Sequence, residues 1–345
     1  RHKLAAILEP VYKQSESHEK VCDMLEIRLE TLDDMDKIPV WQEIYDIRHD
    51  ALDDKALAFN AAVELFKLDP ENETVWENLE TLAADEAVES GYARLNDLYA
   101  TIETDDEHND AWRYAILRRR ALIVEEKLED ETNCVPLWEK LHDYEADDME
   151  PINHLENLYK SSTAYEKLVK LYEFKAQHSD SSDEERIQYY LDAAQIYEDI
   201  LTDSNNAIRV FQSVIEIDNT QEDALKALER LYIANGLWSE LASLYDEELN
   251  LYTDSDQLHD IRCNLASVCT DHLADYERAI DCYTSVLTDN PAHEKALADA
   301  DILLHKLVSV ECDNVADYRS ALCELLEPIY VQLDDKAKLV SLLRI

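Results

Sequence analysis

Glycine is the residue that this sequence lacks most clearly. Only Gly91 and Gly236 occur in 345 residues, and proline numbers 7, where average usage would give about 24 and 17. Primed β-turns, bulges and phosphate-binding loops depend on glycine. The composition therefore disfavours β-rich and α/β folds and predicts an all-α chain.

Positive charge is scarce as well. Lys and Arg number 32 against 78 Asp and Glu, which gives a formal net charge of −46 at pH 7. A surface this negative repels phosphate backbones and anionic headgroups, so we expect no nucleic-acid partner and no membrane insertion. No apolar run approaches the ~18 residues of a membrane span. Hydrophobic residues nevertheless make up 46% of the chain, which is enough to bury a core.

Motifs for catalysis are also missing. The chain has no His-Glu-x-x-His, no glycine-rich phosphate loop and no Gly-x-Ser-x-Gly. We therefore predict a chain that is not an enzyme, with no catalytic residue, no cofactor and no metal site. A helical-toroid enzyme, which is also built from helical hairpins, stays open as an alternative.

What the sequence does contain is an internal repeat. Moved back by 72 positions, Ala279–Tyr283 falls on Ala207–Phe211, and Leu228–Tyr232 repeats Leu155–Tyr159 after a shift of 73. Further copies that begin with Leu-Glu are Leu8–Tyr12, Leu79–Leu82 and Leu326–Tyr330. The apolar residues of these copies have the i, i+3, i+4 spacing of one face of an α-helix.

The repeat length predicts the architecture. Polar breaks separate about nineteen helical segments, so a period of ~73 residues contains four helices, or two hairpins of ~36 residues. One such break, Ser179–Glu185, is expected to cap a helix N-terminus. A single hairpin cannot bury both of its apolar faces, so neighbouring hairpins must stack into a solenoid.

The hairpins carry a characteristic pattern, with Trp238, Leu241, Ala242 and Tyr245 on one helix and Ala207, Phe211 and Val214 on another. It resembles the tetratricopeptide repeat (TPR), with the first set at first-helix positions and the second set at second-helix positions. The likeness is to the long, degenerate arrays of large bacterial proteins. The resemblance implies a right-handed α-solenoid of antiparallel hairpins that acts as a protein-interaction scaffold in a larger assembly.

Two other interpretations stay open. Val75–Leu79 and Leu137–Tyr144 are similar to the Trp-then-aromatic pattern of the half-a-tetratricopeptide repeat, which is typical of RNA-processing scaffolds. An engineered repeat array would also show this regularity.

We expect one continuous helical-repeat array over residues 1–345. The TPR-like repeats would cover 1–84, degenerate repeats 85–154, the best match 155–304, and further degenerate repeats 305–345. The chain opens on Arg1 and stops inside a helical pattern, so we expect a piece of a longer protein. The seven scattered cysteines indicate free thiols. A cytoplasmic location is therefore expected, or a periplasmic one if a signal peptide precedes the chain.

Cys263, Cys269, His272 and Cys282 carry the ligand atoms that zinc prefers. The shift of 72, however, puts the three cysteines on core positions of the repeat, which are Leu191, Tyr197 and Val210. We interpret them as core residues, because cysteine packs as a small hydrophobe.

The resemblance implies that the concave face of the first helices binds the partner. The polar residues expected there are Gln195, Glu198, Asp199, Ser243, Asp246, Glu247, Ser267 and Asp271. None of them is basic, so a clamp for a peptide carboxylate is not expected, and the acids would attract cations. We therefore predict a protein or peptide partner with a basic surface.

Overall fold

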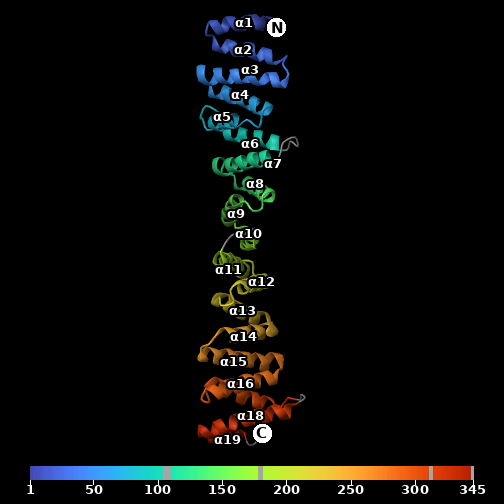
Figure 1. Cartoon of the computed structure of the whole chain (residues 1–345), viewed down its shortest axis with the longest axis vertical. Coiled ribbons are helices and arrows are strands. Elements are labelled where there is room, and N and C mark those ends of the chain that lie inside the picture. The colour runs from blue at the N-terminus through green and yellow to red at the C-terminus, as the bar shows by residue number, and fades with distance from the viewer. Residues whose placement is uncertain (104–109, 178–181, 311–313, 343–345) are drawn as a thin grey trace. The chain divides into compact units, whose positions relative to one another are not determined.

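The computed structural model describes residues 1–103, 110–177, 182–310 and 314–342. In this part of the chain there are nineteen α-helices, three short π-helical turns and no strand (Figure 1). The all-α prediction and the expected number of helices are therefore confirmed. No described helix is both long and apolar enough to cross a membrane.

The chain forms two compact units, and in each of them consecutive helices pack against one another. The described helices of the first unit, Arg1–Thr163, are α1 (His2–Gln14), α2 (His18–Leu29), α3 (Asp34–Asp46), α4 (Lys55–Leu68), α5 (Glu73–Ala83), α6 (Gly91–Glu103), α7 (Asp110–Leu122), α8 (Glu131–Tyr144) and α9 (Met149–Ser161). Those of the second unit, Ala164–Ile345, are α10 (Tyr165–Gln177), α11 (Asp183–Asp199), α12 (Ser204–Ile217), α13 (Glu222–Asn235), α14 (Trp238–Leu251), α15 (Ser255–Val268), α16 (Tyr276–Asp289), α17 (Glu294–Lys306), α18 (Val315–Gln332) and α19 (Lys336–Leu342). The π-helical turns extend three of these helices and are η1 (Ile47–Ala51), η2 (Ile123–Lys127) and η3 (Cys269–Leu273). The expected grading of repeat quality along the chain stays a prediction.

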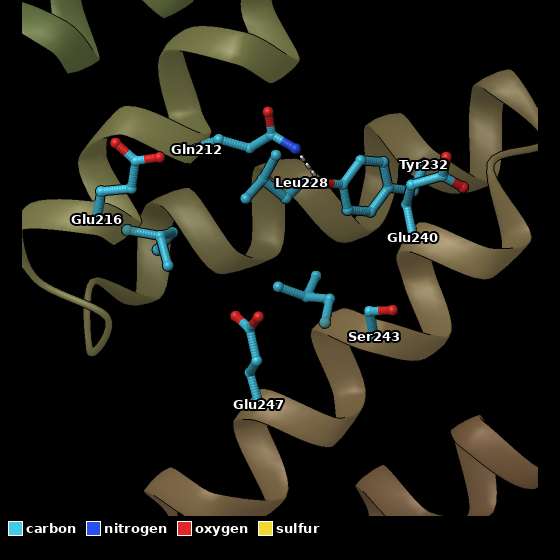
Figure 2. A pocket seen from close by; sticks show the side chains of 9 residues that line it. Gln212, Glu216, Leu228, Tyr232, Glu240, Ser243 and Glu247 are labelled. Atoms are coloured by element: carbon cyan, nitrogen blue, oxygen red, sulfur yellow. Dashed lines mark hydrogen bonds between the residues drawn. The ribbon is translucent and has the colours of Figure 1, made fainter.

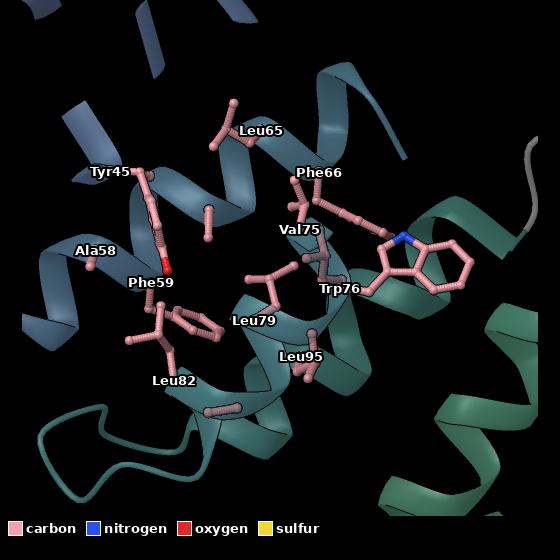
Figure 3. Close-up of a cluster of buried hydrophobic side chains, with 14 of the residues drawn as sticks. Tyr45, Ala58, Phe59, Leu65, Phe66, Val75, Trp76, Leu79, Leu82 and Leu95 are labelled. Carbon is pink, nitrogen blue, oxygen red and sulfur yellow. The ribbon is translucent and has the colours of Figure 1, made fainter. Parts of the chain in front are cut away.

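The apolar stripes of the sequence repeat lie between helices. Leu228, Leu231 and Tyr232 of α13 are buried, as are the matching residues of α9. In the first unit Phe59 and Phe66 of α4 belong to the same buried cluster as Leu79 of α5 (Figure 3). Burying one such side chain contributes about 1.5–3 kcal/mol, so the stripes hold neighbouring helices together.

The period of the sequence is also a period of turn geometry. The turn before each of α4, α8, α12 and α16 has one residue at left-handed φ, between 51° and 53°, followed by an aspartate that caps the next helix. The left-handed residues are Asp53, Glu129, Thr202 and Ala274, and the capping residues are Asp54, Asp130, Asp203 and Asp275. Because the four turns are copies of one turn, the repeat of four helices is confirmed.

The expected helix cap at Ser179–Glu185 is confirmed in its described part. Ser182 accepts a hydrogen bond from the Glu185 backbone N–H, and the Glu185 carboxylate accepts one from the Ser182 backbone N–H. This reciprocal capping box begins α11. Positions 179–181 lie outside the described residues.

Replacing the capping residue Asp275 should lower the free energy of unfolding. Its carboxylate accepts a hydrogen bond from the Arg278 backbone N–H at 3.2 Å, and Asp275→Ala should cost about 1 kcal/mol. Asp281→Ala is the matched control, since Asp281 is exposed on the same helix and has no described hydrogen-bond partner. Urea unfolding followed by circular dichroism measures both variants. Equal losses would contradict the capping role.

Candidate partner-binding surface

The eight predicted binding residues lie on three helical segments of the second unit. Gln195, Glu198 and Asp199 are on α11, Ser243, Asp246 and Glu247 on α14, and Ser267 and Asp271 on α15 and η3. None of the eight is buried. The structure therefore leaves all of them accessible, although on different helices.

Three of the five acids in this set are already neutralised. The Glu198 carboxylate lies 2.6 Å from the Arg230 guanidinium, and Asp271 lies 3.0 Å from the Lys306 ammonium. Asp246 pairs with Arg278 in the same way. Each base belongs to a helix two further along the chain, so the negative charge of these three acids is compensated within the chain. Asp199 and Glu247 have no ion pair with another described residue.

A groove with a volume of about 420 Å³ lies where α12, α13 and α14 meet (Figure 2). Its apolar lining comes from Ile215, Leu228 and Leu244, of which the last two are buried. The buried Tyr232 side chain enters it as well, and its hydroxyl accepts a hydrogen bond from the Gln212 amide at 2.9 Å. The groove thus offers an apolar lining and a phenol to a ligand.

The remaining lining of this groove is polar and acidic. It consists of the exposed residues Gln212, Glu216, Glu240, Ser243 and Glu247. No Lys or Arg lines the groove, and none of its three carboxylates has an ion pair within the described residues. Burial raises the pKa of Tyr232, and the nearby charges of Glu240 and Glu247 raise it further. Two of the eight predicted residues, Ser243 and Glu247, therefore belong to a negatively charged groove.

The cysteines behave as core residues, as the sequence repeat predicts. Cys263, Cys269 and Cys282 are buried, and burial raises their thiol pKa values to about 11, 11 and 12. The thiols are therefore protonated at neutral pH, as expected of cysteines that pack as core residues. His272 stacks on Trp238 instead, with the ring centroids 3.5 Å apart. Within the described residues no group of three or more His, Cys, Asp or Glu side chains is placed to hold a metal ion.

Comparison with known proteins identifies the repeat. Residues 224–258, in α13, α14 and the start of α15, match the family model of the tetratricopeptide repeat. The stacked hairpins and this match make the chain a TPR-like helical-repeat protein. No curated protein matches it in sequence.

Several solved structures are similar to this chain. One is Naa15/Naa10 bound to HypK-THB, with 14% identity and a TM-score of 0.37, covering 99% of this chain and 51% of that one. The human IFIT1 dimer with PPP-AAAA has 15% identity and a TM-score of 0.31, covering 99% of this chain and 89% of that one. A tetratricopeptide repeat protein from Parabacteroides merdae has 12% identity and a TM-score of 0.29, covering 82% of this chain and 98% of that one. The chain spans about half the length of the first of these.

The family match corrects the assignment of first and second helices. A tetratricopeptide repeat is a first helix followed by a second, so α13 is the first helix of this repeat and α14 the second. The pattern Trp238, Leu241, Ala242 and Tyr245 lies on α14, and its assignment to first-helix positions is therefore wrong. Ser243, Asp246 and Glu247 accordingly lie on a second helix, not on the face formed by first helices.

Gln212, Glu216 and Glu240 complete the groove and were not predicted from the sequence. The first two are four residues apart on α12, and Glu240 and Glu247 are seven apart on α14, so each pair lies along one helix face. This spacing is visible in the sequence. What brings the two faces together is the packing of α12 and α14 on either side of Leu228 and Tyr232.

Ion pairs should contribute much less to the stack than apolar contacts do. Arg230→Gln removes a partner from an exposed pair and should change the free energy of unfolding by less than about 1 kcal/mol. Leu231→Ala, one residue further on the same helix, removes a buried side chain and should cost about 2–5 kcal/mol. Urea unfolding of the two variants makes the comparison. A loss for Arg230→Gln as large as that for Leu231→Ala would mean that charge holds these helices together.

Proposed function

We propose that this chain is a non-catalytic protein-interaction scaffold and that it binds a Lys- or Arg-bearing segment of its partner in the α12–α14 groove. The observation that carries the proposal is the set of three exposed carboxylates, Glu216, Glu240 and Glu247, around an apolar lining with no base among them. An aliphatic or aromatic side chain of the partner would pack on the half-buried Ile215 and on the small exposed parts of Leu228 and Leu244. A neighbouring cationic side chain would meet the carboxylates.

Charge and apolar contact have different roles in this proposal. The carboxylates raise the local concentration of cationic segments and thus the association rate. The apolar lining supplies most of the affinity, because burial of apolar surface is the dominant favourable contribution to association. The same negative charge disfavours RNA, the ligand of the alternative scaffold type, because phosphates would be repelled.

The other predicted residues have a smaller part. Glu198, Asp246 and Asp271 each hold a base of this chain already, so a partner would gain less from them. Gln195, Asp199 and Ser267 remain candidates for contacts outside the groove. The six described cysteines are free thiols, which supports a cytoplasmic location within a larger complex.

Neutralising the groove should slow association with basic peptides. The full chain and its Glu216→Gln, Glu240→Gln, Glu247→Gln variant are compared on an array of random peptides, and the association rates of the selected peptides are measured by surface plasmon resonance. We expect the wild type to select peptides rich in Lys and Arg. The variant should associate at least about threefold more slowly at low salt, and the difference should fade by about 0.5 M salt, where the Debye length is roughly 4 Å.

The matched control removes the same charge elsewhere in the second unit. Glu277→Gln, Asp281→Asn and Glu294→Gln neutralise three exposed acids without described ion pairs that do not line the groove. This control should change the association rate less than the groove variant does. Equal effects of the two variants, or peptides with no excess of Lys and Arg, would contradict the proposal.

A further inference from the structure

A second groove, of about 210 Å³, lies where α13, α14 and α15 meet. This second groove is distinct from the α12–α14 groove, because the two have no lining residue in common: on the shared helices α13 and α14, different residues line each groove. The second groove lies between α13 and α15, with α14 as its floor. The first lies between α12 and α14, with α13 as its floor. Leu225 and Ile261 give it apolar walls, and Tyr245 is buried beside them. Two half-buried carboxylates, Glu229 and Glu248, line it as well.

Within the described residues, neither carboxylate has a cation that neutralises it. Glu229 accepts a hydrogen bond from the Tyr245 hydroxyl at 2.5 Å, and Glu248 has no described hydrogen bond or ion pair. Burial raises the pKa of Glu248 to about 7, and the nearby charge of Glu229 contributes. The one base in the lining, Lys226, pairs with Glu222 at 2.8 Å.

The same position elsewhere in the chain shows what completes such a site. Glu229 follows Leu228 in one copy of the sequence repeat, and Glu80 follows Leu79 in another. The Glu80 carboxylate lies 3.4 Å from the hydroxyl of Tyr99, which belongs to the next helix. Glu229 has the same kind of contact with Tyr245. In that copy, however, a helix two further along adds a guanidinium, which is the Arg119 side chain of α7 at 2.6 Å.

In the α13–α15 groove that guanidinium has no counterpart. The residues of α15 that line it are Gln257, Asp260, Ile261 and Asn264, and none of them is basic. Glu9, the equivalent acid of α1, is likewise met by bases of its own chain, Lys13 and Arg28. Glu229 therefore stands in a position where two other repeats, those of Glu9 and Glu80, hold a cationic side chain.

We propose that the α13–α15 groove takes an arginine side chain of a bound protein, whose guanidinium lies against Glu229 and Glu248 while its aliphatic stem packs on Leu225 and Ile261. A guanidinium fits because it donates in a planar fork to carboxylates, and Glu229 and Glu248 line the groove together. This is a second site beside the α12–α14 groove, on different residues, and it does not depend on that groove's being occupied.

Binding at this site should strengthen with pH. The titratable groups that face Glu248 in the groove are Glu222, Lys226 and Glu229 of α13, Tyr245 and Tyr252 of α14, and Asp260 of α15. Of these, Lys226 is held by Glu222, and the tyrosines stay neutral because burial raises the pKa of each. Glu248 is thus the group that changes charge near neutrality. Since a guanidinium prefers the ionised carboxylate, affinity should rise between pH 6 and pH 8.

The test uses the full chain and two short fluorescein-labelled peptides. One has a single arginine between leucine and tyrosine residues, and the other has citrulline, its neutral isostere, in place of arginine. By fluorescence anisotropy the wild type should prefer the arginine peptide about tenfold at pH 8, as expected for hydrogen bonds to charged groups. The preference should be smaller at pH 6. Glu229→Gln with Glu248→Gln should reduce the preference at pH 8 and remove its pH dependence, leaving the smaller preference that the carboxylates of the α12–α14 groove give.

The variant of the first groove serves as the control, because it also removes three acids. Glu216→Gln, Glu240→Gln, Glu247→Gln should keep the pH-dependent preference for arginine. Loss of that preference in this variant but not in Glu229→Gln, Glu248→Gln would overturn the second site and leave the first one standing. No preference for arginine over citrulline in the wild type at pH 8 would also overturn it.

A measurement without ligand guards against misfolding of the variant. Glutamine resembles the protonated form of Glu248, so Glu248→Gln should raise the thermal midpoint at pH 8, where the wild-type carboxylate is ionised without a partner. At pH 5 the Glu248 carboxyl of the folded wild type is protonated and neutral, like glutamine. The wild type and Glu248→Gln should then unfold at nearly the same temperature. A lower midpoint for Glu248→Gln at pH 8 would contradict the absence of a cation at this carboxylate.

Discussion

The packing of one apolar stripe on the next is the constraint on which the rest of this structure depends. The stripes of α9 and α13 repeat Leu, Leu and Tyr at helical spacing, as in Leu228, Leu231 and Tyr232, and are buried between neighbouring helices. A helix in the interior of either unit contacts a helix on both sides. Stability then accumulates hairpin by hairpin, and the polar surface is left free to vary.

Charge varies on this constant framework, and the variation gives the surface its chemistry. Several copies of the sequence repeat have a glutamate directly after the first leucine of the stripe, but the side chains that this glutamate contacts differ from copy to copy. Glu80 meets Arg119 of a later helix, whereas Glu229 meets only the hydroxyl of Tyr245. An acid that forms an ion pair within the chain contributes to the packing of the helices. An acid without such a pair is available to bind a cationic side chain of a partner. Glu216, Glu240 and Glu247 of the first groove are acids of the second kind, as are Glu229 and Glu248 of the second groove.

Much of the fold was accessible from the sequence because it rests on local spacing. The scarcity of glycine predicted an all-α chain, and the 73-residue shift predicted a period of four helices. The recurring turn at Thr202 and Asp203 has the same period. Which helix of a hairpin is the first and which is the second could not be predicted from local spacing. Trp238, Leu241 and Tyr245 have the helical spacing of a first helix, and the same stripe also serves on a second helix. Local spacing alone does not distinguish the two.

The binding surface was predicted less well because it depends on contacts between helices that are two apart. Arg230 lies 32 positions after Glu198, and Arg278 lies 32 after Asp246, so one hairpin length separates each base from its acid. An inspection of single helices does not reveal such pairs, although the repeat length would locate them. Glu247 was predicted through the assignment of its helix to first-helix positions, which is wrong, and Glu216 was missed because α12 carries a second-helix pattern.

The central claim is that apolar packing fixes the stack and leaves the acids of the α12–α14 groove for a cationic partner. Photo-crosslinking from within the groove tests it most directly. A benzophenone amino acid replaces Ser243, the full chain is irradiated with a random peptide library, and mass spectrometry identifies the attached peptides. We expect them to contain Lys and Arg well above the proportion in the library. Attached peptides with the composition of the library, or an excess of Asp and Glu, would contradict the claim.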